Sequence, residues 1–90
     1  MSAGTHSATP EDLDAIGTKL EDQVGIVDTI RGDVDRQLNN AAWTGPARDA
    51  FQEQWTSSFV PALNKLNDAF TGTGKDCHTR AENTRIALGA

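Results

Sequence analysis

The sequence predicts an all-α fold, an antiparallel hairpin of two long helices. Apolar residues recur every three or four positions through both halves of the 90-residue chain, as they do in amphipathic helices. Thr9 and Pro10 form a typical helix start, and Trp43-Thr44-Gly45 lies close to the midpoint of the chain. Together these three observations indicate one helix before the midpoint, one after it and a bend between them.

The composition excludes several classes of function. The net charge is −5 and the eight Lys and Arg residues are scattered, so the basic stripe of a nucleic-acid-binding protein is missing. No apolar run approaches the roughly 18 residues that a membrane span needs. The sequence holds no Cys/His cluster with metal-ligand spacing, and we expect no metal and no cofactor. Cys77 is most simply a small buried hydrophobic residue, with an intermolecular disulfide as the alternative.

The first helix is predicted to follow a disordered tail at residues 1–9 and to run from Pro10 to Asn40. The Thr9 hydroxyl can accept a free backbone N–H, and Pro10 lacks the N–H that would otherwise be unsatisfied. Glu11 and Asp12 complement the positive end of the helix dipole. The tail also lacks the basic and apolar regions of a Sec signal peptide, so any export is expected to use another route.

The apolar positions of this first helix form a wide stripe. They are Leu13, Ile16, Leu20, Val24, Val27, Ile30, Val34, Leu38 and Ala41. The stripe covers roughly 120°, which is broader than a coiled-coil seam. Gly17, Gly25 and Gly32 each weaken the helix by about 1 kcal/mol relative to Ala. Packing rather than helix propensity must therefore stabilise this segment.

The bend is predicted at Trp43-Thr44-Gly45. Thr44 is unfavourable inside a helix, Gly45 readily ends one, and Pro46 is suited to begin the next. Trp43 is too large and apolar to be left without a packing partner, so we expect it to close the open end of the helical bundle.

The second helix is predicted to begin at Pro46. Its apolar positions are Ala47, Phe51, Trp55, Phe59, Ala62, Leu63, Leu66 and Phe70, and the same face continues through Thr73, Cys77, Ala81 and Leu88. Pro61 removes a backbone donor, which predicts a kink at residues 57–61. Residues 71–74 (Thr-Gly-Thr-Gly) predict a break or fraying, followed by a C-terminal arm that ends in a flexible tail at residues 83–90.

A two-helix hairpin of this size leaves the flanks of such wide stripes in water. The economical solution is a dimer in which two hairpins form a four-helix bundle, and a poorly stable monomer is the alternative. The predicted core and dimer residues are Leu13, Ile16, Leu20, Val27, Ile30, Val34, Phe51, Trp55, Phe59, Leu63, Leu66 and Phe70.

Residues 10–82 resemble the WXG (ESAT-like) family of small proteins secreted by type VII secretion systems. The resemblance rests on the chain length, the two amphipathic helices, the missing signal peptide, the central Trp43-Thr44-Gly45, and Phe51 and Trp55 just after it. It implies a homodimeric or heterodimeric four-helix bundle that is exported folded from the cytoplasm. It also implies recognition by a secretion ATPase.

The resemblance further implies a two-part export signal. One part is the bend, carried here by Trp43 and Gly45. The other is a C-terminal Tyr-x-x-x-Asp/Glu element, and this chain contains no tyrosine. The nearest equivalent is His78-Thr79-Arg80-Ala81-Glu82, in which His78 and Glu82 lie on one helix face. They form either a degenerate signal or an ordinary solvated pair, and a partner chain that supplies the tyrosine is a further option.

The predicted function is therefore a non-enzymatic secretion substrate or adaptor. The alternative is an intracellular targeting chaperone that pairs with the helical N-terminus of a larger secreted toxin. A membrane-lytic effector is a weaker third interpretation, because surface-active helices are usually rich in Lys and Arg. Catalysis is not expected: Cys77 and His78 are adjacent and do not face each other on a helix. The acidic residues are most simply a solvated face, namely Glu11, Asp12, Asp14, Asp33 and Asp35.

Overall fold

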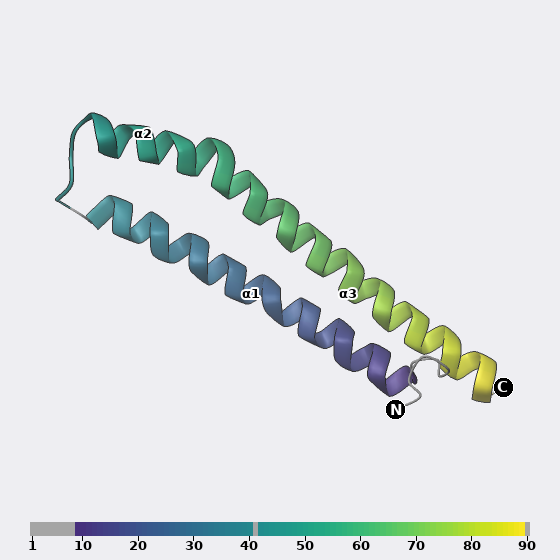
Figure 1. Cartoon of the computed structure of the whole chain (residues 1–90). Helices are drawn as coiled ribbons and strands as arrows, with labels where there is room; N and C mark the ends of the chain where they lie inside the picture. The colour runs from purple at the N-terminus through teal and green to yellow at the C-terminus, as the bar shows by residue number, and fades with distance from the viewer. Residues whose placement is uncertain (1–8, 41, 90) are drawn as a thin grey trace, which may run out of the picture.

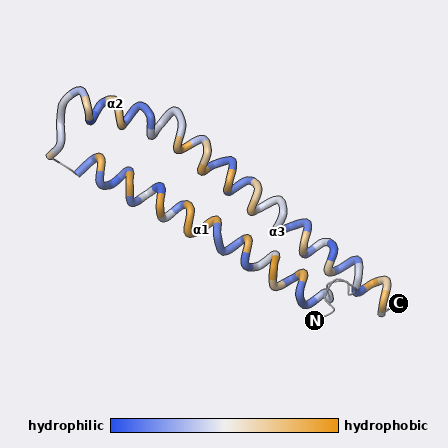
Figure 2. The backbone as a smooth tube through the Cα atoms, in the orientation of Figure 1, coloured by the Kyte–Doolittle hydropathy of each residue, from blue (hydrophilic) through white to orange (hydrophobic). Residues whose placement is uncertain are grey.

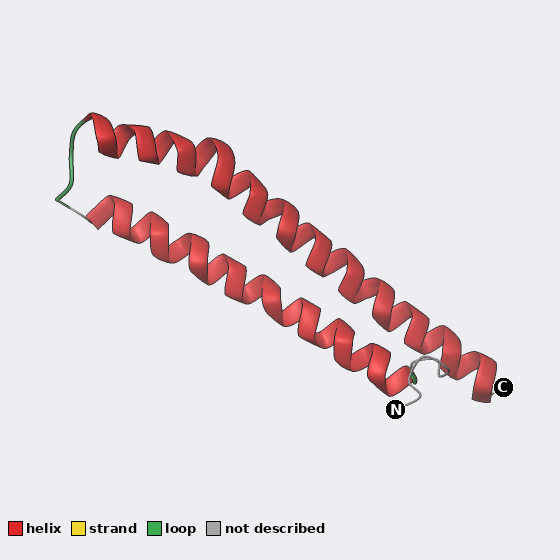
Figure 3. Ribbon diagram, viewed as in Figure 1, coloured by secondary structure: helices red, strands yellow, loops and turns green. Residues whose placement is uncertain are grey.

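The protein is an elongated pair of helical arms. The computed structural model describes residues 9–40 and 42–89, which measure 64 × 27 × 18 Å along their principal axes. Helix α1 (Pro10–Asn40) forms the first arm; α2 (Pro46–Gln54), the π-helical η2 (Trp55–Phe59) and α3 (Val60–Gly89) form the second. The two arms run antiparallel, and the described residues contain helix and loop without a strand (Figures 1 and 3).

Helix α1 begins and ends where the sequence predicts. The Asp12 backbone N–H donates to Thr9 Oγ1 at 3.1 Å, and the Leu13 N–H donates to the Thr9 carbonyl at 3.0 Å. Thr9 is therefore the N-cap, with Pro10 in the first helical position. The rest of the predicted tail, residues 1–8, lies outside the described residues, as do Ala41 and Ala90.

The irregularity predicted next to Pro61 is present as a π-helical turn. The Val60 backbone N–H donates to the Trp55 carbonyl, five residues earlier, instead of four. A proline ring clashes with the carbonyl four residues before it, which here belongs to Ser57, and the wider turn relieves that clash. Figure 1 shows the second arm changing direction between α2 and α3.

The break predicted at residues 71–74 is wrong. Helix α3 continues through this segment to Gly89, and residues 83–89, which the sequence assigns to a tail, extend the same helix. The reason is a close approach between the arms. Gly74 is buried, and its Cα faces Gly17 of α1 so closely that a Cβ on Gly74 would lie 3.1 Å from the Gly17 carbonyl oxygen. Packing against α1 thus compensates for the weak helix propensity of glycine.

A small set of side chains forms the buried seam between the arms. Four apolar residues of the described chain are buried: Val27, Leu38, Trp55 and Ala81, of which Ala81 is fully enclosed. Among the predicted core residues, Val27 and Trp55 are thus buried. Those that are half-buried are Leu13, Leu20, Val34, Leu63 and Phe70, and those that remain exposed in the single chain are Ile16, Ile30, Phe51, Phe59 and Leu66.

Polar contacts across the middle of the seam help to fix how the arms are aligned. The Asn67 side-chain amide donates to Asp28 Oδ1 at 3.0 Å, and the Arg31 guanidinium donates to Asn64 Oδ1 at 2.9 Å. A shift of one arm along the other would separate both pairs. Apolar residues recur along the full length of both arms (Figure 2), so apolar packing alone would tolerate such a shift more easily.

Substitution of alanine for two glycines of α1 should have opposite effects. A Cβ on Gly17 would lie 2.9 Å from the Gly74 carbonyl oxygen and 2.9 Å from His78 Nε2, so Gly17→Ala must push the arms apart. Gly25 has nothing within 4 Å of the added atom, so Gly25→Ala should stabilise the helix by about 1 kcal/mol. Thermal unfolding followed by circular dichroism should show a lower Tm for Gly17→Ala and a higher Tm for Gly25→Ala. A higher Tm for both would contradict the close contact.

Candidate functional site

The connection between the arms depends on a glycine. Gly45 has φ 114° and ψ −178°, a conformation that is essentially restricted to glycine because it has no Cβ. Pro46 follows it as the first residue of α2. Gly45 thus lies between α1, which ends at Asn40, and α2, which begins at Pro46.

Trp43 lies in the same connection and is 46% exposed. Its ring packs at a tilt against Phe51 of α2, with the ring centroids 6.3 Å apart. Beside it is an open, mostly apolar hollow of about 380 Å³. The hollow is lined by Asp33, Val34, Gln37, Leu38, Trp43 and Phe51. Within the single chain Trp43 therefore covers the end of the seam in part and leaves an apolar surface open.

Two hydrogen bonds hold this end of the hairpin together. The Arg48 guanidinium of α2 donates to the Leu38 carbonyl at 2.9 Å, and so satisfies an acceptor in the last turn of α1. The buried Trp55 donates its Nε1–H to Asp35 Oδ1 at 2.7 Å. Asp35, which the sequence predicts on a solvated acidic face, is exposed and also accepts a hydrogen bond from the polar group of a core tryptophan.

Both arms carry large apolar side chains beside the seam. On α1, Ile16 is 51% and Ile30 is 47% exposed, and in the second arm Phe59 is 44% and Leu66 is 42% exposed. Isolated exposed hydrophobic residues are common, but rows of them beside a seam are typical of a protein-protein contact.

These exposed residues lie on the same side of the hairpin. Ile30 precedes the buried Leu38 by eight residues, and Leu66 precedes the buried Gly74 by the same number. Each is therefore rotated by about 80° from the seam in the same sense. Two antiparallel helices are related by an approximate two-fold axis perpendicular to their common plane, so equal rotations bring both residues to one side. We call this side, with Ile16, Ile30, Phe59 and Leu66, the open apolar face.

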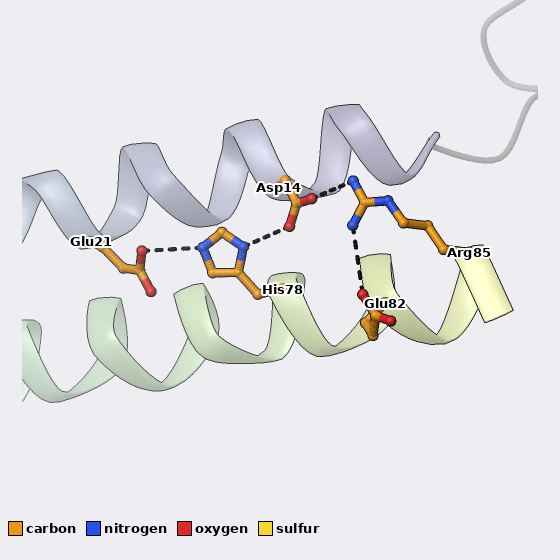
Figure 4. A network of polar contacts seen from close by, with 5 residues as sticks. All are labelled: Asp14, Glu21, His78, Glu82 and Arg85. Carbon is orange, nitrogen blue, oxygen red and sulfur yellow. Dashed lines mark hydrogen bonds and ion pairs between the residues drawn. The ribbon is translucent and has the colours of Figure 1, made fainter.

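The far end of the hairpin is held by charged residues. His78 of α3 lies between two carboxylates of α1, with Nδ1 2.7 Å from Asp14 Oδ1 and Nε2 3.1 Å from Glu21 Oε1 (Figure 4). Arg85 donates to Asp14 Oδ2 at 2.5 Å. We call His78, Asp14, Glu21 and Arg85 the ionic cluster.

The contacts of the ionic cluster shift the pKa values of Asp14, His78 and Arg85. Hydrogen bonds from His78, and then from Arg85, lower the pKa of Asp14 below its usual 3.8. Hydrogen bonds to Asp14, and then to Glu21, raise the pKa of His78 above its usual 6.5. The hydrogen bond to Asp14 likewise raises the pKa of Arg85. Each shift favours the charged form of the group.

The structure separates the two residues of the predicted C-terminal signal. His78 turns toward α1, whereas the Glu82 side chain is 66% exposed and lies 4.0 Å from Arg85. No hydrogen bond or ion pair joins His78 to Glu82 in residues 9–40 and 42–89. The two residues thus do not form a pair with each other, and Glu82 is the more accessible.

Sequence reasoning missed the ionic cluster. The sequence predicts Asp14 on a solvated acidic face and Gly17 as a weak point of the helix. One pattern could have revealed the site: Asp14 and Glu21 are seven residues apart on either side of Gly17, so two carboxylates flank a position without a side chain. A basic side chain of the facing helix fits that gap.

Cys77 is a half-buried free thiol. Across residues 9–40 and 42–89, no group of three or more His, Cys, Asp or Glu residues is arranged to hold a metal ion. None of the helices described is long and apolar enough to cross a membrane.

No protein-family model matches the chain, and neither a curated protein nor a solved structure matches it significantly. The connection, the open apolar face and the sequence resemblance are therefore the features that bear on its function.

Substitution of Gly45 should destabilise the hairpin. In Gly45→Ala a Cβ would occupy a backbone conformation that costs of the order of 1–3 kcal/mol for other residues. Nothing lies within 4 Å of the added atom, so backbone strain rather than a clash should cause the loss. Urea denaturation should show a lower midpoint for Gly45→Ala than for the wild type, whereas the control Gly72→Ala, in which a helical glycine also has nothing within 4 Å, should show a higher one. An unchanged midpoint would show that this backbone conformation is not required.

Proposed function

We propose that this protein is a non-enzymatic substrate or adaptor of a type VII secretion system that works as one half of a four-helix bundle. The observation that carries the proposal is the open apolar face. A hairpin that exposes Ile16, Ile30, Phe59 and Leu66 on one side gains stability when a second hairpin covers them. The partner is either a second copy of this chain or a related helical hairpin.

Export is the part of the proposal that rests on the sequence resemblance. Under this proposal, the secretion system recognises the Trp43-Thr44-Gly45 bend. The half-exposed Trp43 and the hollow beside it offer an apolar contact to a secretion ATPase. Glu82 supplies the accessible carboxylate of the C-terminal element. The protein would leave the cytoplasm as a folded complex.

A targeting chaperone is the second candidate, and one observation favours it. The chain has no tyrosine, and His78, the residue at the tyrosine position, is engaged by Asp14 and Glu21 of its own hairpin. A partner would then supply the complete signal. This function requires the same open apolar face but no export signal in this chain.

Pairing should depend on Leu66 and not on an apolar residue of the opposite side. Leu66→Asp would bury an unpaired carboxylate between two hairpins, so we expect loss of the complex. Ile86 is 58% exposed and lies about half a turn around α3 from Leu66, so Ile86→Asp should leave pairing intact. Sedimentation equilibrium on the self-associated protein, or on its complex with a partner hairpin, distinguishes the two variants. Equal association of Leu66→Asp and the wild type would refute the assigned face.

Export should depend on Trp43. Removal of its ring in Trp43→Ala deletes an apolar contact surface that is half exposed, so the helices and the pairing should survive while export is lost. The control is Ile86→Ala, which removes an exposed apolar side chain far from the connection. Immunoblots of cells and medium from the native host measure export. If Trp43→Ala protein reaches the medium at the wild-type level, the bend is not an export signal.

The chaperone alternative predicts a different partner. Affinity purification of the wild-type chain from its host should then recover a larger protein with a helical N-terminal region, and Leu66→Asp should fail to recover it. Recovery of nothing except further copies of this chain would exclude the alternative.

A further inference from the structure

The His78 side chain lies in a position that suits its charged form. Figure 4 shows the ring between Asp14 and Glu21, with one nitrogen directed at each carboxylate. The distances are 2.7 Å from Nδ1 to Asp14 and 3.1 Å from Nε2 to Glu21. Glycine at position 17 makes this possible, because a Cβ there would lie 2.9 Å from His78 Nε2.

Both contacts require a hydrogen on each ring nitrogen. A carboxylate only accepts hydrogen bonds, and the imidazolium ion donates from both nitrogens. A neutral imidazole carries one N–H, so its other nitrogen would present a lone pair to a carboxylate. Neutral His78 can therefore keep one of its two contacts with α1 and must lose the other.

The surroundings decide which contact is lost. In the described chain, α1 is the element packed against this part of α3, and the acidic groups that it presents are Asp14 and Glu21, with Glu11 further toward its start. On α3 itself, Arg85 bonds to Asp14, and Glu82 lies beside Arg85. Asp14 keeps a cationic partner when His78 is neutral, whereas Glu21 has no other hydrogen-bond or ion-pair partner within residues 9–40 and 42–89.

Apolar packing does little for the last turns of α3. Ala81 is the last buried apolar residue of the helix, and beyond it Ile86 is 58% and Leu88 is 77% exposed. The contacts that join this segment to α1 are largely those of the ionic cluster. Its attachment should therefore follow the charge of the cluster more closely than does the rest of the hairpin.

We propose that His78 is a proton-dependent clasp that fastens the C-terminal turns of α3 to α1. Protonated His78 bridges Asp14 and Glu21 and holds the arms together at the end opposite the connection, which we call the open end of the hairpin. Neutral His78 releases Glu21, and the turns from His78 to Gly89 separate from α1 more often. The clasp is a property of the hairpin and does not rest on the proposed export function.

The direction of the pH dependence follows from the two titrations. Because the pKa of His78 is raised in the folded state, its contribution to stability is complete below about pH 6.5. That contribution is lost as the pH rises through the higher pKa of the folded state. Because the pKa of Asp14 is lowered in the folded state, its contribution to stability is present above about pH 3.8. That contribution is lost as the pH falls through the lower pKa of the folded state. The clasp is therefore closed between these limits and opens on the alkaline side.

Nuclear magnetic resonance of the purified full-length protein tests the proposal. The His78 ring should titrate with a midpoint above 6.5, and in the double variant Asp14→Asn/Glu21→Gln the midpoint should fall toward 6.5. The chain's other histidine, His6, is removed with His6→Gln to assign the signal. Hydrogen-exchange protection of residues 78–89, corrected for the intrinsic effect of pH, should be lost between about pH 5 and about pH 8, while that of residues 24–34 persists.

Two variants separate the clasp from a merely structural role. His78→Lys keeps a positive charge at both pH values, so residues 78–89 should stay protected throughout. The glutamine side chain in His78→Gln does not titrate, so the hydrogen-exchange protection of residues 78–89 should be weak and independent of pH. A wild-type midpoint at or below 6.5, or the same loss of protection with pH in His78→Gln as in the wild type, would overturn the proposal. Glu82→Gln, in a residue that does not touch His78, serves as the matched control.

Discussion

The structure depends on the seam along which α1 packs against α3. Two helices can bury one side of each other and cannot enclose a core, so a hairpin of this kind has few fully buried apolar side chains. Here four apolar residues are buried in the described chain, and each arm keeps large apolar side chains in water beside the seam. The open apolar face is a direct consequence of this limit. For the same reason, we expect the hairpin to act with a partner.

The two ends of the seam are stabilised by different interactions. At the connected end, aromatic packing of Trp55 and its hydrogen bond to Asp35 are joined by the contact of Arg48 with the last turn of α1. At the open end, glycines bring the helices close and charged side chains span the gap. Apolar burial varies little with pH or salt, whereas partly exposed ion pairs respond to both. The open end is therefore the part of the hairpin that solution conditions can alter.

Much of the fold could be predicted from the sequence because the strongest patterns are local. The Thr9-Pro10 start, the periodicity of α1 and the disturbance next to Pro61 each follow from rules that act within a few residues. The continuity of α3 could not be predicted in the same way. Its glycines look like breaks until Gly74 is placed opposite Gly17, and that pairing joins residues far apart in the chain.

The candidate site was predictable to a smaller extent for the same reason. The prediction at Gly45 needs only the local backbone preference of glycine, and Gly45 has a φ of 114° in the structure. The partners of His78 depend on how the arms are aligned, so the sequence paired it with Glu82, four residues away, and not with Asp14 and Glu21. Local spacing favours neighbours on one helix, and the structure shows that the opposite helix supplies the stronger contacts.

We propose above all that the open apolar face must be covered for this hairpin to be stable. The most direct test is the molar mass of the wild-type protein over a wide dilution series, with circular dichroism measured on the same samples. We predict that helix content and association are lost together on dilution, or that the isolated chain is a monomer with little helix until a partner hairpin is added. A monomer that stays fully helical and thermally stable at every concentration would contradict the account.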